Sequence, residues 1–306
     1  MGLIPGAWVE VLSAGEILAT LEADQSLEGL PFMPEMLAFC GRTFQVQIHA
    51  DRTCVRALPP GEHEPIRGLR DCVVLVGLRC GGGFHGGCQL GCMLFWKEAW
   101  LKQVTGPRPG PEIPAGPPAD GLPVNRGQDP SVFFCQGTEL GRATTRGQSK
   151  WDPREYIGML RAGTFAVPEL VRMLHVAGSR KVELAIRSRL QSHAPPAQEE
   201  AGEVLGLQPG EWVEVKGMPE ILRTLDARHC RKGLAFSNDM FGFCGRRFQV
   251  QHRIDTLLDE KTGKLRQVQH TVTLVGTDCQ KYMGCARQMP LLWRELWLRR
   301  VDSPGG

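Results

Sequence analysis

The segment Gly6-Ala-Trp-Val-Glu-Val11 returns later in the chain as Gly210-Glu-Trp-Val-Glu-Val215, an offset of 204 residues. The same offset continues without a gap as far as residue 47. Further matched segments are Phe39-Cys-Gly-Arg42 with Phe243-Cys-Gly-Arg246, Phe44-Gln-Val-Gln47 with Phe248-Gln-Val-Gln251 and, after a loop of different length, Trp96-Lys-Glu-Ala-Trp-Leu101 with Trp293-Arg-Glu-Leu-Trp-Leu298. A repeat of this length determines the organisation of a whole chain. The sequence therefore predicts two copies of one module.

Each copy has the pattern of several short strands and one short helix. Trp8–Val11 alternates with period two, as do 42–48 and 73–78, whereas 16–21 has Ile and Leu at helical spacing. A last strand is expected near 100–104, which makes each copy a small β module. The sequence predicts a mainly β fold with a helical connector, in which two tandem SH3-like barrels are related by duplication. The leading Gly-x-Trp-Val-x-Val strand resembles the first strand of SH3-like barrels, including the KOW type.

The predicted domain boundaries follow the repeat. Residues 1–105 form the first module, and 106–130, rich in Pro and Gly without an apolar period, form a linker. Residues 131–198 form a helical connector, in which Asp152 can cap a helix whose first position is a proline. Residues 199–306 form the second module.

Composition limits the class of protein. The chain has 306 residues, enough for two domains, and its 42% hydrophobic and 23% charged residues are typical of folded soluble proteins. A formal net charge of +3 is too small to indicate nucleic-acid or membrane binding. The amino terminus lacks a secretory pattern, and no long apolar run suggests a membrane span, so a cytoplasmic protein is expected.

The cysteines are the main chemical signal in the sequence. Eleven thiols cannot all pair as intramolecular disulfides, and clustered thiols in a reducing compartment favour metal ligation. Cys80, His85, Cys88 and Cys92 lie within one glycine-rich segment, and thiolate and imidazole are the ligands that zinc prefers. Glycine allows the chain to turn tightly around an ion. The sequence predicts a zinc site here, with Cys40 as an alternative to His85 for the fourth ligand.

The second copy keeps only part of this ligand set. Three candidate ligands have counterparts, but Cys92 matches Met289, and His85 falls in a shortened stretch near Tyr282. The matched thiols are Cys40 with Cys244, Cys80 with Cys279 and Cys88 with Cys285. A second metal site is therefore expected to be degraded.

Other interpretations of the thiols remain open. An iron–sulfur cluster would use Cys40, Cys80, Cys88 and Cys92, a catalytic metal or reactive thiol would use part of the same set, and buried core cysteines would bind nothing. Phosphate-binding loops, dinucleotide fingerprints, Gly-x-Ser-x-Gly elbows and His-Glu-x-x-His pairs do not occur in the sequence. Whether the protein is an enzyme stays undecided.

The motifs together resemble those of a bacterial family of duplicated, cysteine-rich SH3-like modules that has no assigned activity. The resemblance rests on Phe-Cys-Gly-Arg-x-Phe, on the stretch Gly87–Cys92, and on Trp-Lys-Glu-x-Trp-Leu. It extends to Cys135-Gln-Gly-Thr-Glu-Leu140 and Trp151-Asp-Pro-Arg154. This resemblance implies that Cys54 and Cys135 are further candidate ligands.

The function expected from the sequence is a metal-stabilised binding or assembly role that acts through a partner protein. Small barrels leave strand edges exposed, and a duplicated module offers two linked surfaces. One alternative is a metalloenzyme or iron–sulfur protein with its site in the first module. Another is an RNA- or DNA-binding KOW-like protein, favoured by arginines such as Arg246, Arg247 and Arg253 but opposed by interspersed acidic residues.

Overall fold

The computed structural model describes residues 2–56, 66–108, 122–127, 129–146, 156–158, 160, 167, 168, 171, 204–279 and 284–303. Most of the predicted linker and connector, including the helix start expected at Asp152, lies outside the described residues. The chain forms two compact units. Unit 1 comprises Met1–Met173, Leu257–Arg266 and Met283–Gln288, and unit 2 comprises Leu174–Thr256, Gln267–Tyr282 and Met289–Gly306. Two short segments of the second copy therefore belong to unit 1.

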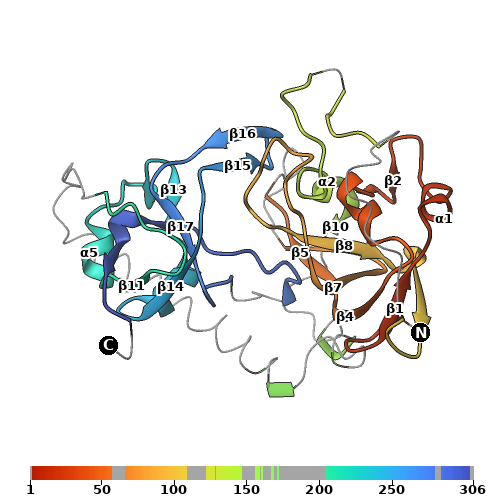
Figure 1. Cartoon of the computed structure of the whole chain (residues 1–306), viewed down its shortest axis with the longest axis horizontal. Coiled ribbons are helices and arrows are strands. Elements are labelled where there is room, and N and C mark those ends of the chain that lie inside the picture. Colours follow the sequence, from red (N-terminus) through yellow and green to blue (C-terminus); the bar gives the residue numbers. More distant parts are fainter. Residues whose placement is uncertain are drawn as a thin grey trace. The chain divides into compact units, whose positions relative to one another are not determined.

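Unit 1 is built on a five-stranded antiparallel sheet with the order β8-β7-β4-β1-β9 (Figure 1). Its strands are β1 (Trp8–Val11), β4 (Thr43–His49), β7 (Cys72–Arg79), β8 (Met93–Lys97) and β9 (Leu101–Val104). The pairing of β4 with β7 shifts register between Val46 and Ile48. Such a bulge increases the local twist, and the sheet curls accordingly.

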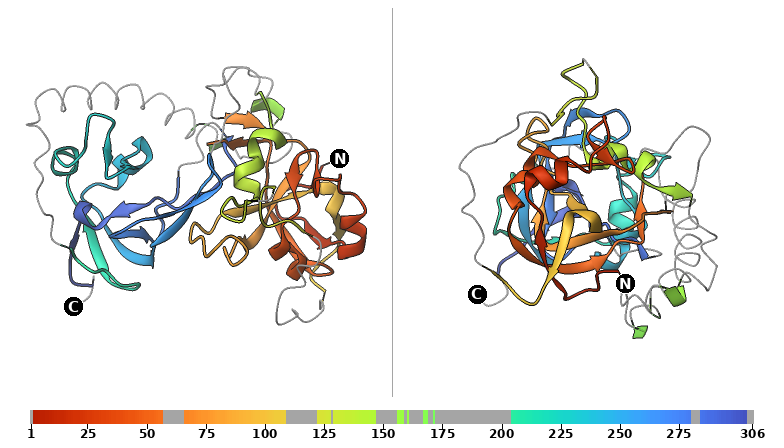
Figure 2. Two further views of the ribbon diagram at one scale, coloured as in Figure 1. Left: turned by 90° about the horizontal axis from the view of Figure 1, so that it is seen from above. Right: turned by 90° about the vertical axis from the view of Figure 1, so that its right-hand side faces the viewer.

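Unit 2 contains the equivalent sheet, with the order β18-β17-β14-β11-β19. Its strands are β11 (Trp212–Val215), β14 (Arg247–Arg253), β17 (Thr271–Leu274), β18 (Trp293–Arg294) and β19 (Leu298–Arg300). The register shift recurs between Val250 and His252, which are 204 residues after Val46 and Ile48. The duplication therefore extends to the irregularities of the sheet. The mainly β prediction is confirmed, and both sheets curl in Figures 1 and 2.

Further strands and short helices complete the two units. The strands outside the two five-stranded sheets are β2 (Ser26–Leu27), β3 (Leu30–Pro31), β5 (Arg52–Cys54), β6 (Ile66–Gly68), β10 (Thr145–Arg146), β12 (Cys230–Arg231), β13 (Leu234–Ala235), β15 (Thr256–Asp259) and β16 (Lys264–Gln267). The helices are α1 (Ala14–Leu18), α2 (Gln136–Ala143) and α5 (Met218–Leu222), and the 3-10 turns are η1 (Pro34–Phe39), η2 (Glu98–Trp100), η3 (Asn238–Phe243) and η5 (Glu295–Trp297).

Each unit has its own aromatic core. In unit 1, Phe32 packs edge-to-face against the fully buried Trp96 and Trp100, with ring centroids 6.3 and 5.3 Å apart. The second core repeats this arrangement with Phe236, Trp293 and Trp297, where the separations are 6.3 and 5.2 Å. Edge-to-face pairs add to the stabilisation from burial of the rings. These four tryptophans are therefore core residues.

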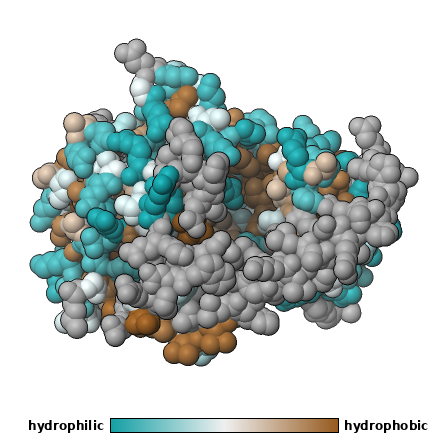
Figure 3. All heavy atoms as spheres, turned by 180° about the vertical axis from the view of Figure 1, so that it is seen from behind, coloured by the Kyte–Doolittle hydropathy of each residue, from teal (hydrophilic) through white to brown (hydrophobic). Residues whose placement is uncertain are grey.

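Hydrophilic and hydrophobic residues are unevenly distributed over the described surface. On the face shown in Figure 3, hydrophilic residues predominate, and hydrophobic ones form smaller patches among them. Among the described residues, every helix is too short or too polar to cross a membrane.

Candidate metal centre

The glycine-rich loop between β7 and β8 carries most of the predicted ligands. The N–H of Cys80 donates to the carbonyl of Cys92 at 2.8 Å, so the two ends of the loop are held together. Inside the loop, the carbonyl of Gly82 accepts from the N–H groups of His85 at 2.9 Å and Gly87 at 3.0 Å. These bonds close the loop into a compact turn.

Gly82 is the residue that permits this turn. Its φ is +72°, and a Cβ added there would lie 1.8 Å from the carbonyl oxygen of Cys88. L-residues with a side chain avoid this φ, and no side chain fits at that distance. Position 82 of the glycine-rich loop therefore requires glycine for steric reasons.

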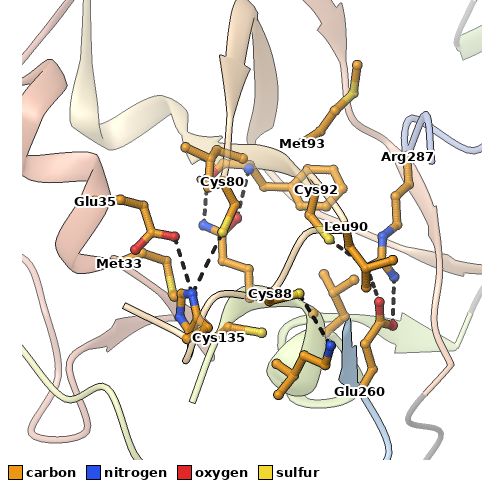
Figure 4. A pocket seen from close by; sticks show the side chains of 17 residues that line it. Met33, Glu35, Cys80, Cys88, Leu90, Cys92, Met93, Cys135, Glu260 and Arg287 are labelled. Atoms are coloured by element: carbon orange, nitrogen blue, oxygen red, sulfur yellow. Dashed lines mark hydrogen bonds and ion pairs between the residues drawn. The ribbon is translucent and has the colours of Figure 1, made fainter. Parts of the chain in front are cut away.

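Three potential ligands converge beside the loop: Glu35, Cys80 and His85. One ligand atom from each lies within 4.8 Å of the others. The Nδ1 atom of His85 is 3.7 Å from the Sγ of Cys80 and 3.7 Å from Oε1 of Glu35 (Figure 4). Glu35 comes from η1, where Pro34 begins the turn, whereas Cys80 and His85 come from the loop. This is the one such group of three ligands that the described part of the chain contains.

The cluster is buried, and its polar atoms lack ordinary partners. The side chain of His85 is 2% exposed and that of Glu35 is 13% exposed. Within the described residues, the carboxylate oxygens of Glu35 and Nε2 of His85 make no hydrogen bond of ordinary geometry. Glu35 interacts instead with Cys80 and His85 at longer range, and the imidazole of His85 interacts with the backbone of Phe134. Buried polar groups without partners are costly in a folded protein. A cation among these atoms would remove that cost, so the donor set fits a metal ion.

The electrostatics of the cluster also fit a cation. Burial raises the pKa of Cys80 far above the usual thiol range, and the carboxylate of Glu35 raises it further. Burial also lowers the pKa of His85, although Glu35 opposes this effect. The cluster therefore favours a neutral thiol and a neutral imidazole until a positive charge arrives. A bound cation reverses this preference for the thiol and favours the thiolate.

Three more thiols line the cavity into which the cluster faces. The cavity has a volume of about 40 Å³, and Cys88, Cys92 and Cys135 lie on its wall together with Cys80 (Figure 4). Cys135 is the N-cap residue of α2, and burial raises its pKa to about 12. Burial likewise raises the pKa of Cys92. Four thiols, one imidazole and the carboxylates of Glu35 and Glu260 thus surround one small space.

One wall of the cavity comes from the segments of the second copy that belong to unit 1. Arg287 and Glu260 form a bidentate ion pair in which both side chains are almost completely buried, and the Nη1–Oε2 distance is 2.9 Å. Arg287 also donates from Nη2 to the Sγ of Cys92 at 3.8 Å. The N–H of Leu258 donates to the Sγ of Cys88 at 3.3 Å. Residues from the second copy of the repeat therefore contact the sulfur atoms of Cys88 and Cys92.

The other predicted ligands lie elsewhere. Cys40 packs against the core of unit 1, where its Sγ lies 4.0 Å from the carbonyl oxygen of Met36, and it is not part of the cavity wall. Cys244 repeats that arrangement with Met240, also at 4.0 Å. Cys279 accepts from the N–H of Met289 at 3.4 Å in unit 2, whereas Cys285 belongs to unit 1. The structure thus brings together Cys80, His85, Cys88 and Cys92, but not Cys40.

Glu35, Glu260 and Arg287 were not predicted from the sequence. A signal for Glu35 exists, because Asp239 stands 204 residues later and keeps an acidic group at the matching position. Glu35 stands 45 residues before Cys80 and outside the Cys80–Cys92 segment, so the acid escapes a search for clustered thiols. Glu260 and Arg287 have no such signal because they come from loops that differ in length between the copies.

The chain was also compared with known proteins. No family model, no curated protein and no solved structure matches it.

Proposed function

We propose that unit 1 is a metal-binding module and that Glu35, Cys80 and His85 hold a single zinc ion. The observation that carries this proposal is the convergence of three buried or half-buried ligand atoms within 4.8 Å, among which Glu35 and His85 have polar atoms that make no hydrogen bond of ordinary geometry in the described chain. Carboxylate, thiolate and imidazole are all ordinary zinc ligands.

Cys92 is the proposed fourth ligand. Its backbone carbonyl accepts a hydrogen bond from the N–H of Cys80, so the backbones of these two cysteines are adjacent at the ends of the loop. Both thiols also line the same cavity. Zinc sites that stabilise a fold are usually four-coordinate, and this set supplies four ligands.

The proposed role of the metal is structural. The loop, η1 and the segments 257–266 and 283–288 all meet at the cavity, so an ion there would connect parts of the sequence that are far apart. A buried site suits this role better than catalysis, which needs a ligand position open to substrate. We therefore favour a binding or assembly protein that acts through a partner protein, with each curled sheet forming an SH3-like module.

A second candidate is an iron–sulfur cluster. It is favoured by the four thiols Cys80, Cys88, Cys92 and Cys135, which all line the same cavity. Such clusters are normally held by four cysteine thiolates, so this set would suffice without Glu35 or His85. It differs from the sequence-based expectation in using Cys135 in place of Cys40.

Elemental analysis together with an absorption spectrum tests both candidates. Protein purified without added metal is expected to contain about one equivalent of zinc and to be colourless. Cys80→Ser and Glu35→Gln should lose the zinc, whereas Cys40→Ser, which changes a thiol outside the cavity, should retain it. A brown protein that contains iron, and that keeps its metal in Glu35→Gln but loses it in Cys135→Ser, would favour the cluster. Well under one equivalent of either metal would falsify the metal-binding proposal.

Thermal melting separates the structural role from a catalytic one. Removal of the metal with a chelator should lower the melting temperature, and zinc should restore it, because metal binding stabilises only the folded state. An unchanged melting temperature after verified metal loss would contradict a structural role.

A further inference from the structure

Cys54 and Cys285 form a pair of adjacent cysteines in unit 1 outside the metal cavity. Cys54 ends β5, and Cys285 comes from the segment 283–288, which is 231 residues further along the chain. Arg52 and Cys285 form a parallel bridge, in which the N–H of Ala286 donates to the carbonyl of Arg52 at 2.8 Å. The N–H of Cys54 then donates to the Sγ of Cys285 at 3.2 Å. Two backbone interactions therefore hold these cysteines side by side.

The two thiols differ in exposure, and this gives them different chemical roles. Cys54 is half-buried, whereas Cys285 is 3% exposed. Neither residue lines the metal cavity. Cys54 is therefore the more accessible residue of the pair, while Cys285 is placed to react with whatever forms on Cys54.

The surroundings of Cys54 also favour its thiolate. A hydrogen bond from the side chain of Cys285 lowers the pKa of Cys54 to about 6, and the nearby charges of Arg287 and Arg56 act in the same direction, against the effect of burial. Arg287 is fixed here because it also contacts the carbonyl of Cys54 at 3.5 Å. The thiolate is the nucleophilic form of cysteine. Cys54 is therefore suited to attack, and Cys285 to resolve.

We infer that Cys54 and Cys285 are a redox-active dithiol whose substrates are low-molecular-weight disulfides such as oxidised glutathione. The thiolate of Cys54 attacks one sulfur of the substrate, its S–S bond breaks, and one glutathione thiolate leaves and takes a proton from water. Cys285 then loses its proton, and its thiolate attacks the sulfur of Cys54, which releases the second glutathione. Two protein thiols become one disulfide by losing two electrons and two protons, and one glutathione disulfide becomes two thiols.

The product would be a covalent bond between β5 and the segment that carries Arg287. Because Arg287 contacts both Glu260 and Cys92, oxidation would fix the wall of the metal cavity as well. The inference does not depend on the metal itself, since the pair is defined by its own contacts.

Peptide mapping of the full-length wild-type chain tests this inference. The protein is incubated with oxidised glutathione, its free thiols are alkylated at acidic pH, and disulfide-linked peptides are identified by mass spectrometry. The expected product is one Cys54–Cys285 cross-link that dithiothreitol reverses. Cys285→Ser should instead accumulate glutathione on Cys54, and Cys54→Ser should leave Cys285 free.

Cys230 is the matched comparison, because it is also half-buried and lies in unit 2. Its glutathionylation should be at least tenfold slower than the reaction of Cys54 at pH 7. Cys54 and Cys285 that stay free under these conditions, or a Cys54 that reacts no faster than Cys230, would overturn the inference. Zinc content measured on the same samples keeps the two proposals distinguishable, because a metal-free chain that still forms the cross-link contradicts only the metal site.

Discussion

Arg253 occupies in the second copy the position that His49 occupies in the first, and each cation lies between two carboxylates. His49 is 2.9 Å from Asp51 through Nδ1 and 3.2 Å from Glu98 through Nε2. Arg253 is 3.3 Å from Asp255 and 3.1 Å from Glu295. Each glutamate also accepts hydrogen bonds from the backbone just before the first strand of its copy. Glu98 accepts from the N–H of Leu3, and Glu295 accepts from the N–H groups of Gly206 and Leu207. One copy thus uses a titratable cation where the other uses a permanent one.

The first prediction is that His49 makes the stability of unit 1 depend on pH. Asp51 raises the pKa of His49, and Glu98 adds to this effect against the opposing effect of burial. Because the pKa of His49 is higher in the folded state than in the unfolded state, protonation of His49 stabilises the fold. This contribution is complete when the pH is below the unfolded-state pKa of about 6.5, and it is lost as the pH rises through the folded-state pKa. His49→Arg should remove this part of the dependence when melting temperatures are measured from pH 5.5 to 8.5.

The exposed His252 provides the control for this measurement. His252→Gln should leave the pH dependence of melting unchanged because that side chain lies on the surface. If His49→Arg keeps the wild-type slope, the ion pairs of His49 do not contribute to stability.

The second prediction concerns the turn that positions the proposed zinc ligands. Gly82→Ala should weaken zinc binding by about 10–100-fold, the range seen when the groups that orient ligands are altered. The reason is steric, since a Cβ at this position lies 1.8 Å from the carbonyl oxygen of Cys88. Gly83→Ala should bind zinc normally, because a Cβ there meets no atom within 4 Å. Competition with a chromophoric zinc chelator measures both affinities, and equal affinities would argue against the role of the turn.

The repeat made much of the fold predictable from the sequence. The alternation at 8–11, 42–48 and 73–78 coincides with β1, β4 and β7, because a half-buried strand must alternate to bury one face. The hairpin of β15 and β16 was not predicted. It falls where the two copies differ in length, so comparison of the copies gives no information there.

The candidate site was predictable only where its residues are close in sequence. Cys80, His85, Cys88 and Cys92 stand in one loop, and the thiols and imidazole identified them directly. Glu35 joins them through the tertiary fold, since η1 is 45 residues from Cys80 along the chain. Cys40 was a reasonable candidate as a thiol present in both copies, but its side chain packs against the core. Retention in both copies therefore coincides here with a position against the core and outside the cavity.

The third prediction tests a tryptophan–threonine hydrogen bond that occurs once in each core. Nε1 of Trp297 donates to Oγ1 of Thr224 at 3.0 Å, and Trp100 donates to Thr20 at 3.1 Å. Thr224→Val should cost about 1–3 kcal/mol in the free energy of unfolding, because it leaves a buried indole N–H without a partner. Thr20→Val should cost a similar amount.

A double-mutant cycle isolates this bond from other effects of the substitutions. Trp297→Phe removes the donor, so Thr224→Val should cost distinctly less in that background than in the wild type. Urea denaturation provides the four free energies. Strictly additive costs would show that the hydrogen bond contributes nothing measurable.

The last prediction concerns the buried ion pair of Glu260 and Arg287 at the cavity wall. Arg287→Met should cost about 3–5 kcal/mol, because it leaves the carboxylate of Glu260 buried without its cation. The double variant Arg287→Met/Glu260→Leu should recover most of that loss, since apolar residues of similar volume often replace a buried pair at little cost.

Arg266→Met is the control, and it lies in the segment that carries Glu260. The Arg266–Asp259 pair has a largely exposed guanidinium and should contribute about 1 kcal/mol or less. Urea denaturation in the presence of a zinc chelator separates these costs from any loss of metal. A double variant as unstable as Arg287→Met would mean that Arg287 stabilises unit 1 through its contacts with Cys54 and Cys92 rather than by neutralising Glu260.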